Sequence, residues 1–241
     1  MSSIRSIFFD LDNTLADDSG SLKQSLEKTL PLISERYPEL TLTKVFQEFR
    51  IVNTWHWENY DESPIGKMKT AQEVRSHIAA ETLEALGHPD MELAYTMAQI
   101  FQAARRETYE CYLDTMPVLQ SLKEKYLLVI VTNGNSEMQR EKIAKCGLEK
   151  VMDAIFIAQE TGFSKPSPEI FHKAMQSVKA KPEASLMVGD HAEKDIQGAK
   201  AVGMQTAWIR REDRSAEVVG SAPDYIVRTM AEIQEIVEQN D

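Results

Sequence analysis

The second half of the chain alternates between short apolar runs, rich in β-branched residues, and segments with helical spacing. The runs expected to be strands are 127–131, 154–157, 186–188, 205–209 and 225–227. Alternation of this kind predicts right-handed crossovers and a parallel, doubly wound sheet of the α/β class. Another apolar run, 4–9, ends at Asp10, and we expect this strand to belong to the same sheet.

A long block of different character separates the first strand from the others. From about Ser19 to Cys111, apolar residues recur at helical spacing with almost no strand signal between them. Because the first strand belongs to the sheet, this block is an insertion. We therefore predict an α/β core made of residues 1–16 and 113–241, with an all-helical cap domain at 17–112.

Composition and charge argue against some classes of binding partner. The formal net charge of −11 argues against a nucleic acid polymer or an anionic membrane surface, because both require clustered Lys and Arg. No apolar stretch approaches the ~18 residues needed to span a membrane. The first apolar run is too short for a signal peptide, and the two cysteines have no CxxC spacing. We expect a cytoplasmic protein, monomeric or homodimeric.

Polar side chains follow several of the predicted strands. In chain order they are Asp10, Asp12, Thr132, Asn133, Lys165 and Asp190. Ligands of open parallel sheets bind at the carboxyl ends of the strands, so we expect these residues to converge on one edge.

The convergent residues suit the transfer of a phosphoryl group. Asp10 and Asp12 could divide a two-step transfer, one attacking phosphorus and the other exchanging protons with the leaving oxygen and with water. Asp190 would complete an oxygen-rich site for a hard cation, with Mg²⁺ the natural occupant. Lys165 supplies positive charge, and Thr132 and nearby backbone amides supply hydrogen-bond donors for the phosphate.

Four stretches of the sequence carry a family resemblance. They are FFDLDNTL, IVTNGNSEMQREKI, GFSKPSPEIF and VGDHAEKDIQGAKAVGM. With these stretches the chain resembles the haloacid dehalogenase-like (HAD) hydrolase superfamily, in the branch that inserts a helical cap after the first motif. The resemblance covers essentially the whole predicted core, which it implies is Rossmann-like, and leaves the cap unmatched.

The resemblance implies roles for the acidic residues. Asp10 would be the nucleophile that forms an aspartyl-phosphate, and Asp12 the general acid and base. Mg²⁺ would be bound by the side chains of Asp10 and Asp190 and by the main-chain carbonyl of Asp12. Asp195 matches the second acid of the last motif, which the family uses for metal-bound water or for the lysine.

The resemblance also implies the phosphate ligands. Thr132 and Lys165 would bind the phosphate, with Asn133 beside them, and Lys165 would also stabilise the charge on Asp10. The predicted substrate is a small phosphorylated metabolite, either a nucleoside monophosphate or a sugar phosphate.

Three alternatives remain open at this stage. A haloacid dehalogenase is disfavoured because its halide leaving group needs no proton, whereas Asp12 is available here to supply one. A phosphomutase shares every core motif, and nothing in the sequence separates it from a phosphatase. A binding or regulatory module is disfavoured because it has no need for such a carboxylate cluster.

The helical block contains several polar and aromatic residues that could have a functional role. Trp55, His56 and Trp57 lie in the densest aromatic cluster, but we expect one Trp to pack in the helical domain and the others to lie at its surface. We expect Asp18 to lie in a solvated hinge. His77 shows no ligand spacing, and we assign it no role.

Overall fold

The computed structural model describes residues 3–211 and 221–240, which form two compact units. The core unit comprises Met1–Asp17, Glu110–Asn133 and Ile143–Asp241, and the helical unit comprises Asp18–Tyr109 and Gly134–Lys142. The predicted core segments also include residues 1–2, 212–220 and 241, which lie outside the described residues. The boundaries predicted for the core and cap domains stay predictions.

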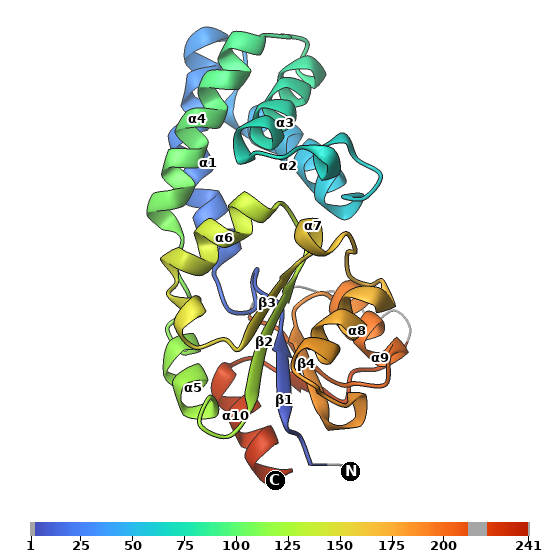
Figure 1. Cartoon of the computed structure of the whole chain (residues 1–241). Helices are drawn as coiled ribbons and strands as arrows, with labels where there is room; N and C mark the ends of the chain where they lie inside the picture. The colour runs from blue at the N-terminus through green and yellow to red at the C-terminus, as the bar shows by residue number, and fades with distance from the viewer. Residues whose placement is uncertain (1–2, 212–220, 241) are drawn as a thin grey trace. The chain divides into compact units, whose positions relative to one another are not determined.

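The core unit is built on a six-stranded sheet in which all neighbouring strands are parallel. The strands are β1 (Ser6–Phe9), β2 (Leu127–Thr132), β3 (Ala154–Ile157), β4 (Ser185–Gly189), β5 (Gln205–Ile209) and β6 (Tyr225–Val227). Their order is β3-β2-β1-β4-β5-β6, so β1 lies in the interior between β2 and β4 (Figure 1). The predicted doubly wound parallel sheet is confirmed.

Both faces of the sheet are buried, as the continuous apolar runs of its strands require. Successive side chains of a strand point to opposite faces. Ile130 packs in one apolar cluster with residues of α5 (Thr115–Leu122) and α10 (Met230–Gln239). Val129 and Val131 pack in a second cluster with residues of α8 (Pro168–Ser177). Helices therefore cover the sheet from both sides.

Further helical elements lie between successive strands of the chain, from β2 to β5. They are α6 (Ser136–Lys145), η2 (Leu148–Lys150), α7 (Ala158–Thr161), η3 (Pro182–Ala184), η4 (Ala192–Gln197) and α9 (Gly198–Ala201). Helix α8 begins with Ser167 as its N-cap residue and Pro168 as its first helical residue, a position that suits proline because its missing N–H has no partner there. The Ser167 hydroxyl bonds the Glu169 carboxylate rather than a helix amide.

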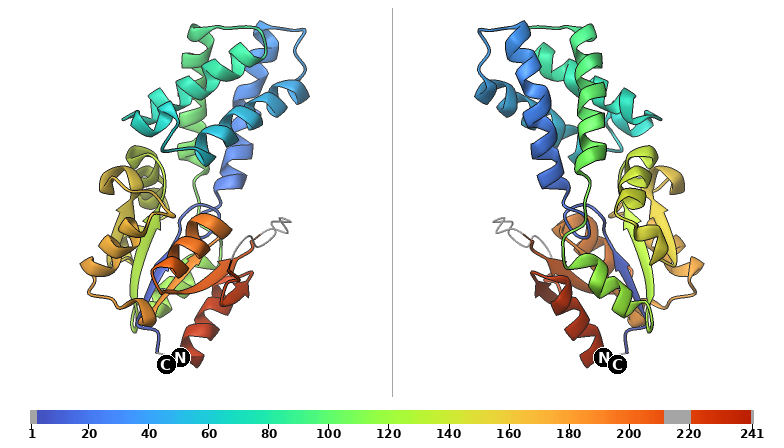
Figure 2. Two further views of the ribbon diagram at one scale, coloured as in Figure 1. Left: turned by 90° about the vertical axis from the view of Figure 1, so that its right-hand side faces the viewer. Right: turned by 90° about the vertical axis from the view of Figure 1, so that its left-hand side faces the viewer.

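The helical unit contains four long helices and one turn of 3₁₀-helix. They are α1 (Asp18–Arg36), α2 (Leu42–Glu58), η1 (Pro64–Lys67), α3 (Ala71–Ala85) and α4 (Met91–Thr108). Helices α1 and α4 run side by side (Figures 1 and 2). The unit has its own apolar core, which includes Ile33, Val45 and Leu83, so its fold does not depend on burying a face against the sheet. No helix among the described residues combines the length and apolarity that crossing a membrane requires.

Most of α6, residues 136–142, belongs to the helical unit, although the sequence places this helix in the core. Asn135 Nδ2 donates to the carbonyl oxygens of Met68 and Lys69, each at 3.2 Å. The backbone amide of Ala71, the first residue of α3, donates to Glu137 Oε2 at 2.7 Å. These bonds join residues more than 60 positions apart in the chain, and no local periodicity could reveal them.

Candidate active site

The candidate site begins at the carboxyl end of β1, where the direction of the strand order reverses. The chain runs from β1 to β2 and β3 on one side and returns from β3 to β4 on the other side of β1, and ligands of doubly wound sheets bind at such a switch point. Asp10 is the first residue after β1, and its backbone amide donates to Val188 O at 2.9 Å. The sheet itself therefore holds the backbone of Asp10.

Lys165 lies between two carboxylates. Its Nζ is 2.7 Å from Oδ1 of Asp10 and 2.6 Å from Oδ1 of Asp195. All three side chains are buried, with Lys165 only 3% exposed. Three segments that follow different strands thus meet through one ammonium group, as the sequence predicts for Asp10 and Lys165.

The pKa values of these groups reflect burial and mutual charge. Burial raises the pKa of the Asp10 carboxyl to about 7, with Lys165 opposing the rise and Asp195 and Asp12 adding to it. Burial alone would lower the pKa of Lys165, but the two carboxylates outweigh it and raise that pKa above its ordinary value. Lys165 is therefore a permanent cation beside Asp10.

Asp195 is held in place on its other side. The backbone amide of His191 donates to Oδ2 of Asp195 at 2.9 Å. A Cβ atom placed on Gly189 would lie 2.3 Å from Cγ of Asp195, so only glycine leaves room for this carboxylate. With one oxygen on Lys165 and the other on a backbone amide, Asp195 acts on Lys165 as a positioning residue.

A set of carboxylate oxygens suited to a divalent cation lies at the same edge. Asp10, Asp190 and Asp195 each offer a ligand atom, and these atoms lie within 4.8 Å of one another. The backbone of Asp190 is held by Trp208, whose Nε1 donates to Asp190 O at 2.8 Å. Hard carboxylate oxygens are the donors that Mg²⁺ prefers, so these residues fit the predicted metal. The oxygens of Asp195 bond Lys165 and the His191 amide, and the side-chain metal ligands that the sequence predicts are Asp10 and Asp190.

Asn133 supports the backbone of Lys165. Its Oδ1 accepts from Lys165 N at 2.8 Å, and its Nδ2 donates to Lys165 O at 2.9 Å. Thr132, the last residue of β2, is buried, and its hydroxyl donates to Asn133 O at 3.3 Å. The sequence places Asn133 with the substrate ligands, whereas its side chain here contacts the lysine segment.

Asp12 lies in the turn that leaves β1. It forms an isolated bridge with Ala16, and Asn13 between them has a positive φ of 58°. The negative charge of Asp12 contributes to the raised pKa of Asp10. The carboxylate of Asp12 is therefore close enough to that of Asp10 to disfavour its ionised form.

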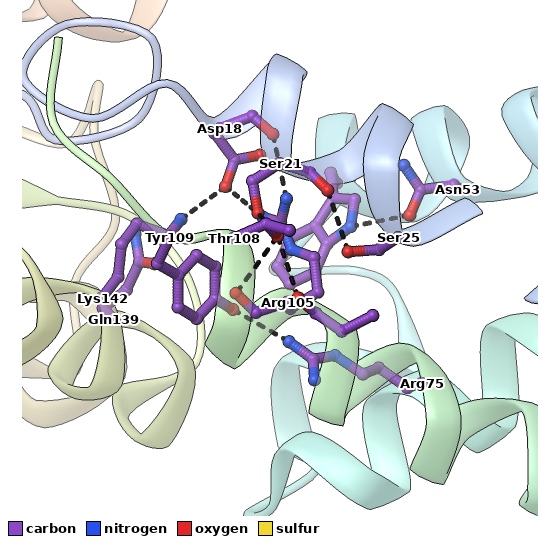
Figure 3. Close-up of polar contacts among 12 residues, drawn as sticks. Asp18, Ser21, Ser25, Asn53, Arg75, Arg105, Thr108, Tyr109, Gln139 and Lys142 are labelled. Atoms are coloured by element: carbon purple, nitrogen blue, oxygen red, sulfur yellow. Dashed lines mark hydrogen bonds and ion pairs between the residues drawn. The ribbon is translucent and has the colours of Figure 1, made fainter. Parts of the chain in front are cut away.

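A second buried charge cluster lies in the helical unit (Figure 3). Asp18 pairs with Arg105 and with Lys142, whose Nζ lies 2.6 Å from Oδ1 of Asp18. Arg105 and Lys142 both lie near the ring of Tyr109, whose hydroxyl accepts from Arg75 at 3.0 Å. Burial would raise the pKa of Asp18, but the two cations reverse this and leave the pKa well below its ordinary value. The expectation that Asp18 lies in a solvated hinge is therefore wrong.

The aromatic cluster of the helical unit divides between core and surface. Trp57 packs against the apolar core and stacks on Tyr60 at 5.6 Å, while Trp55 is exposed. His56, which lies between the two Trp residues, is completely buried.

The comparisons with known proteins agree with this geometry. A family model described as haloacid dehalogenase-like hydrolase matches residues 4–203. The chain belongs to this family. The resemblance seen in the four motifs is confirmed, and the match spans the helical insertion as well as most of the core.

Relatives of this HAD hydrolase share its full length. It is 28% identical to N-acylneuraminate-9-phosphatase of Mus musculus over 259 aligned positions, covering 100% of the chain and 96% of the relative. It is 27% identical to glyceraldehyde 3-phosphate phosphatase of Pyrococcus furiosus, again covering 100% of the chain and 96% of the relative. Among solved structures, the magnesium-bound HAD-hydrolase YfnB of Bacillus subtilis superposes with a TM-score of 0.78 at 25% identity, covering 98% and 99% of the two chains.

The charge cluster of the helical unit yields a stability prediction. Asp18→Asn removes the carboxylate that neutralises Arg105 and Lys142, and the loss of this counter-charge beside two buried cations should lower the free energy of unfolding by about 3 kcal/mol. Urea denaturation followed by tryptophan fluorescence measures this loss. Glu27→Gln, which removes an exposed carboxylate from the same helix, is the control and should change stability by less than about 0.5 kcal/mol. Equal, small effects of both substitutions would show that the Asp18 pairs contribute little.

Proposed function

We propose that this HAD hydrolase is a Mg²⁺-dependent phosphatase that cleaves a small phosphomonoester through an aspartyl-phosphate on Asp10. The observation that carries the proposal is the buried Lys165 shared by Asp10 and Asp195 at the strand ends, beside the Asp190 carboxylate. A carboxylate and a fixed cation therefore lie side by side, where both could contact one bound phosphate. Transfer of a phosphate dianion requires such a nucleophile and such a positive charge. The phosphatase names of the relatives support the same chemistry.

In the first step, an Asp10 carboxylate oxygen attacks phosphorus and the bond from phosphorus to the ester oxygen breaks. Asp12 gives its proton to the departing alkoxide, so the alcohol leaves neutral. In the second step, Asp12 takes a proton from water as the water oxygen attacks the phosphorus of the aspartyl-phosphate. The bond to Asp10 breaks, inorganic phosphate is released, and both carboxyl groups return to their starting states.

The surrounding residues supply the electrostatics. Asp10 and Asp190, with the main-chain carbonyl of Asp12, would hold Mg²⁺, whose charge would offset that of the phosphate. Lys165 would bind a phosphate oxygen and favour the ionised form of Asp10, because its ammonium opposes the rise that burial causes in the pKa of that carboxyl. Thr132 and the backbone amides that follow it would donate to the remaining oxygens. Asp195 and Asn133 would hold Lys165 in position.

The names of two relatives support one of the predicted substrate classes. The names of the relatives refer to the phosphate esters of a sugar acid and of a triose, which favours a phosphorylated sugar derivative over a nucleoside monophosphate. The helical unit would act as a cap that encloses a small substrate and excludes water during transfer.

The principal rival on the same core is a phosphomutase. A mutase would return the phosphoryl group to a second hydroxyl of its sugar and release little inorganic phosphate. The full-length similarity to enzymes named as phosphatases favours hydrolysis. The presence of Asp12 likewise favours an oxygen leaving group over the halide of a dehalogenase.

Phosphate release from a panel of phosphomonoesters tests the proposed activity. We expect release from at least one small sugar phosphate with Mg²⁺, loss of release with chelator, and recovery when Mg²⁺ is restored. Asp10→Asn should reduce release at least about 10³-fold because the nucleophile is lost. Glu183→Gln, an exposed carboxylate of the same unit, should leave the rate unchanged. Isomerised sugar phosphate without phosphate release would establish the mutase instead.

The role of Asp12 is tested by comparing leaving groups. Asp12→Ala should lower the turnover of an alkyl phosphate by about 10²–10⁴-fold, because the alkoxide then leaves without a proton. The loss should be clearly smaller for p-nitrophenyl phosphate, whose phenolate is stable unprotonated. The ratio of kcat values for variant and parent, measured with both substrates at saturating Mg²⁺, is the decisive quantity. Equal losses for the two substrates would contradict a role as general acid.

A further inference from the structure

The helical unit contains a second group of metal-ligating side chains that shares no residue with the candidate active site. His56, His77 and Glu81 each offer one ligand atom, and these atoms lie within 4.8 Å of one another. We propose that these three residues bind a divalent transition-metal ion of the Zn²⁺ class. The inference is independent of the proposed phosphatase activity.

The secondary structure brings the three side chains together. His77 and Glu81 are four residues apart on α3 and therefore project from the same face of that helix. His56 comes from the last turn of α2. Glu81 faces both imidazoles, with Oε2 at 2.9 Å from Nε2 of His56 and Oε1 at 2.9 Å from Nε2 of His77.

A neighbouring hydroxyl can set the tautomer of His56. Its Nδ1 lies 2.6 Å from Oγ of Ser63, which also accepts the backbone amide of Ile65 at 3.3 Å. When Nδ1 carries the ring proton and donates it to Ser63, Nε2 carries a lone pair that faces the Glu81 carboxylate. In this tautomer two acceptors face each other at 2.9 Å, and a metal ion between them would be bound by both. Such an outer hydrogen bond is the usual way in which proteins orient a metal-bound imidazole.

His77 offers a second nitrogen ligand, and no hydrogen bond within the described part of the chain satisfies this nitrogen. Its Nε2 is buried and, among the residues the structure describes, has no hydrogen-bond partner, although Glu81 Oε1 lies 2.9 Å away. The contact is close, but its angle does not suit an N–H···O bond. An unsatisfied buried nitrogen is costly, and coordination of a metal would satisfy it.

The donor set selects the metal. Two imidazole nitrogens and one carboxylate oxygen suit Zn²⁺ and its neighbours, whereas Mg²⁺ and Ca²⁺ prefer oxygen alone. In a tetrahedral site with bonds of about 2.1 Å, ligand atoms lie about 3.4 Å apart, so the present separations need only small adjustments. The side chains of Glu81 and His77 are 41% and 26% exposed, which gives an ion and a fourth, water ligand a route from solvent.

Binding would join two helices at their packed faces. His56 lies in the last turn of α2 and the other two ligands lie on α3, so one ion would cross-link the two helices. A site of this kind stabilises the unit that contains it, by an amount that grows with the free metal concentration.

The test uses Co²⁺ as a spectroscopic probe of the full chain. All proteins carry Asp190→Asn, which weakens the carboxylate site of the core and isolates the helical unit. We expect one equivalent of Co²⁺ to bind with the intense visible bands of four-coordinate cobalt, and Zn²⁺ to displace it. The same equivalent of Zn²⁺ should raise the melting temperature of the chain.

Variants assign the ligands. Glu81→Gln, which keeps the shape of the side chain, and His77→Ala should each weaken Co²⁺ binding at least about tenfold and remove the Zn²⁺-dependent rise in melting temperature. His88→Ala is the matched control, because His88 is 27% exposed in the same unit and also faces a glutamate. It should bind as the parent does. Circular dichroism establishes that each variant is folded.

Two results would overturn the proposal. One is the absence of Co²⁺ and Zn²⁺ binding by the parent, in which case the three side chains form only a hydrogen-bonded cluster. The other is metal binding that Glu81→Gln and His77→Ala leave as tight as His88→Ala does, which would place the ion elsewhere.

Discussion

The candidate site depends on one buried ammonium group shared by two carboxylates. Charges removed from water are tolerated only when they are paired at close range, and Lys165 meets this requirement with Asp10 and Asp195 at 2.7 and 2.6 Å. Because the three residues follow different strands, their pairing holds three segments in register at the switch point of the sheet. The groups around them serve the same pairing: Asn133 holds the backbone of the lysine, and Gly189 leaves room for Asp195.

The helical unit follows the same principle with other residues. Asp18 joins α1 to α4 through Arg105 and to α6 through Lys142, so one carboxylate connects three helices. Glu81 contacts His56 of α2 and His77 of its own helix in a similar way. In both clusters an acidic side chain that looks ordinary in the sequence gains its partners only through packing. Each unit of this HAD hydrolase thus organises polar groups within an apolar interior, the core for chemistry and the helical unit for its own cohesion.

The strands and the residues at their carboxyl ends could be predicted because their sequence patterns are local. Apolar runs bounded by polar turns located all six strands, and the predicted bounds of β3, β5 and β6 are those of the structure. The order of Asp10, Lys165 and Asp190 along the chain sufficed to predict convergence, because parallel strands carry their carboxyl ends to one edge. Long-range contacts could not be predicted: the sequence places Asp18 in a solvated hinge, whereas Arg105 and Lys142 pair with it, and no local pattern shows that most of α6 groups with the helical unit. The spacing of His77 and Glu81 was a usable signal, but only His56 makes it a ligand set.

The sequence by itself determined the family, the parallel sheet and the residues that can meet at its edge, since strand periodicity and motif order are properties of the linear chain. Tertiary structure alone decided which partners those residues have: Asp195 on Lys165 and the His191 amide, Asn133 on the lysine backbone, and Asp18 between two cations. The physical reason is that burial and pairing are set by distances between segments far apart in the chain. A local pattern contains the identity of a charged group, whereas its neighbours determine whether that group is solvated, paired or bound to a metal.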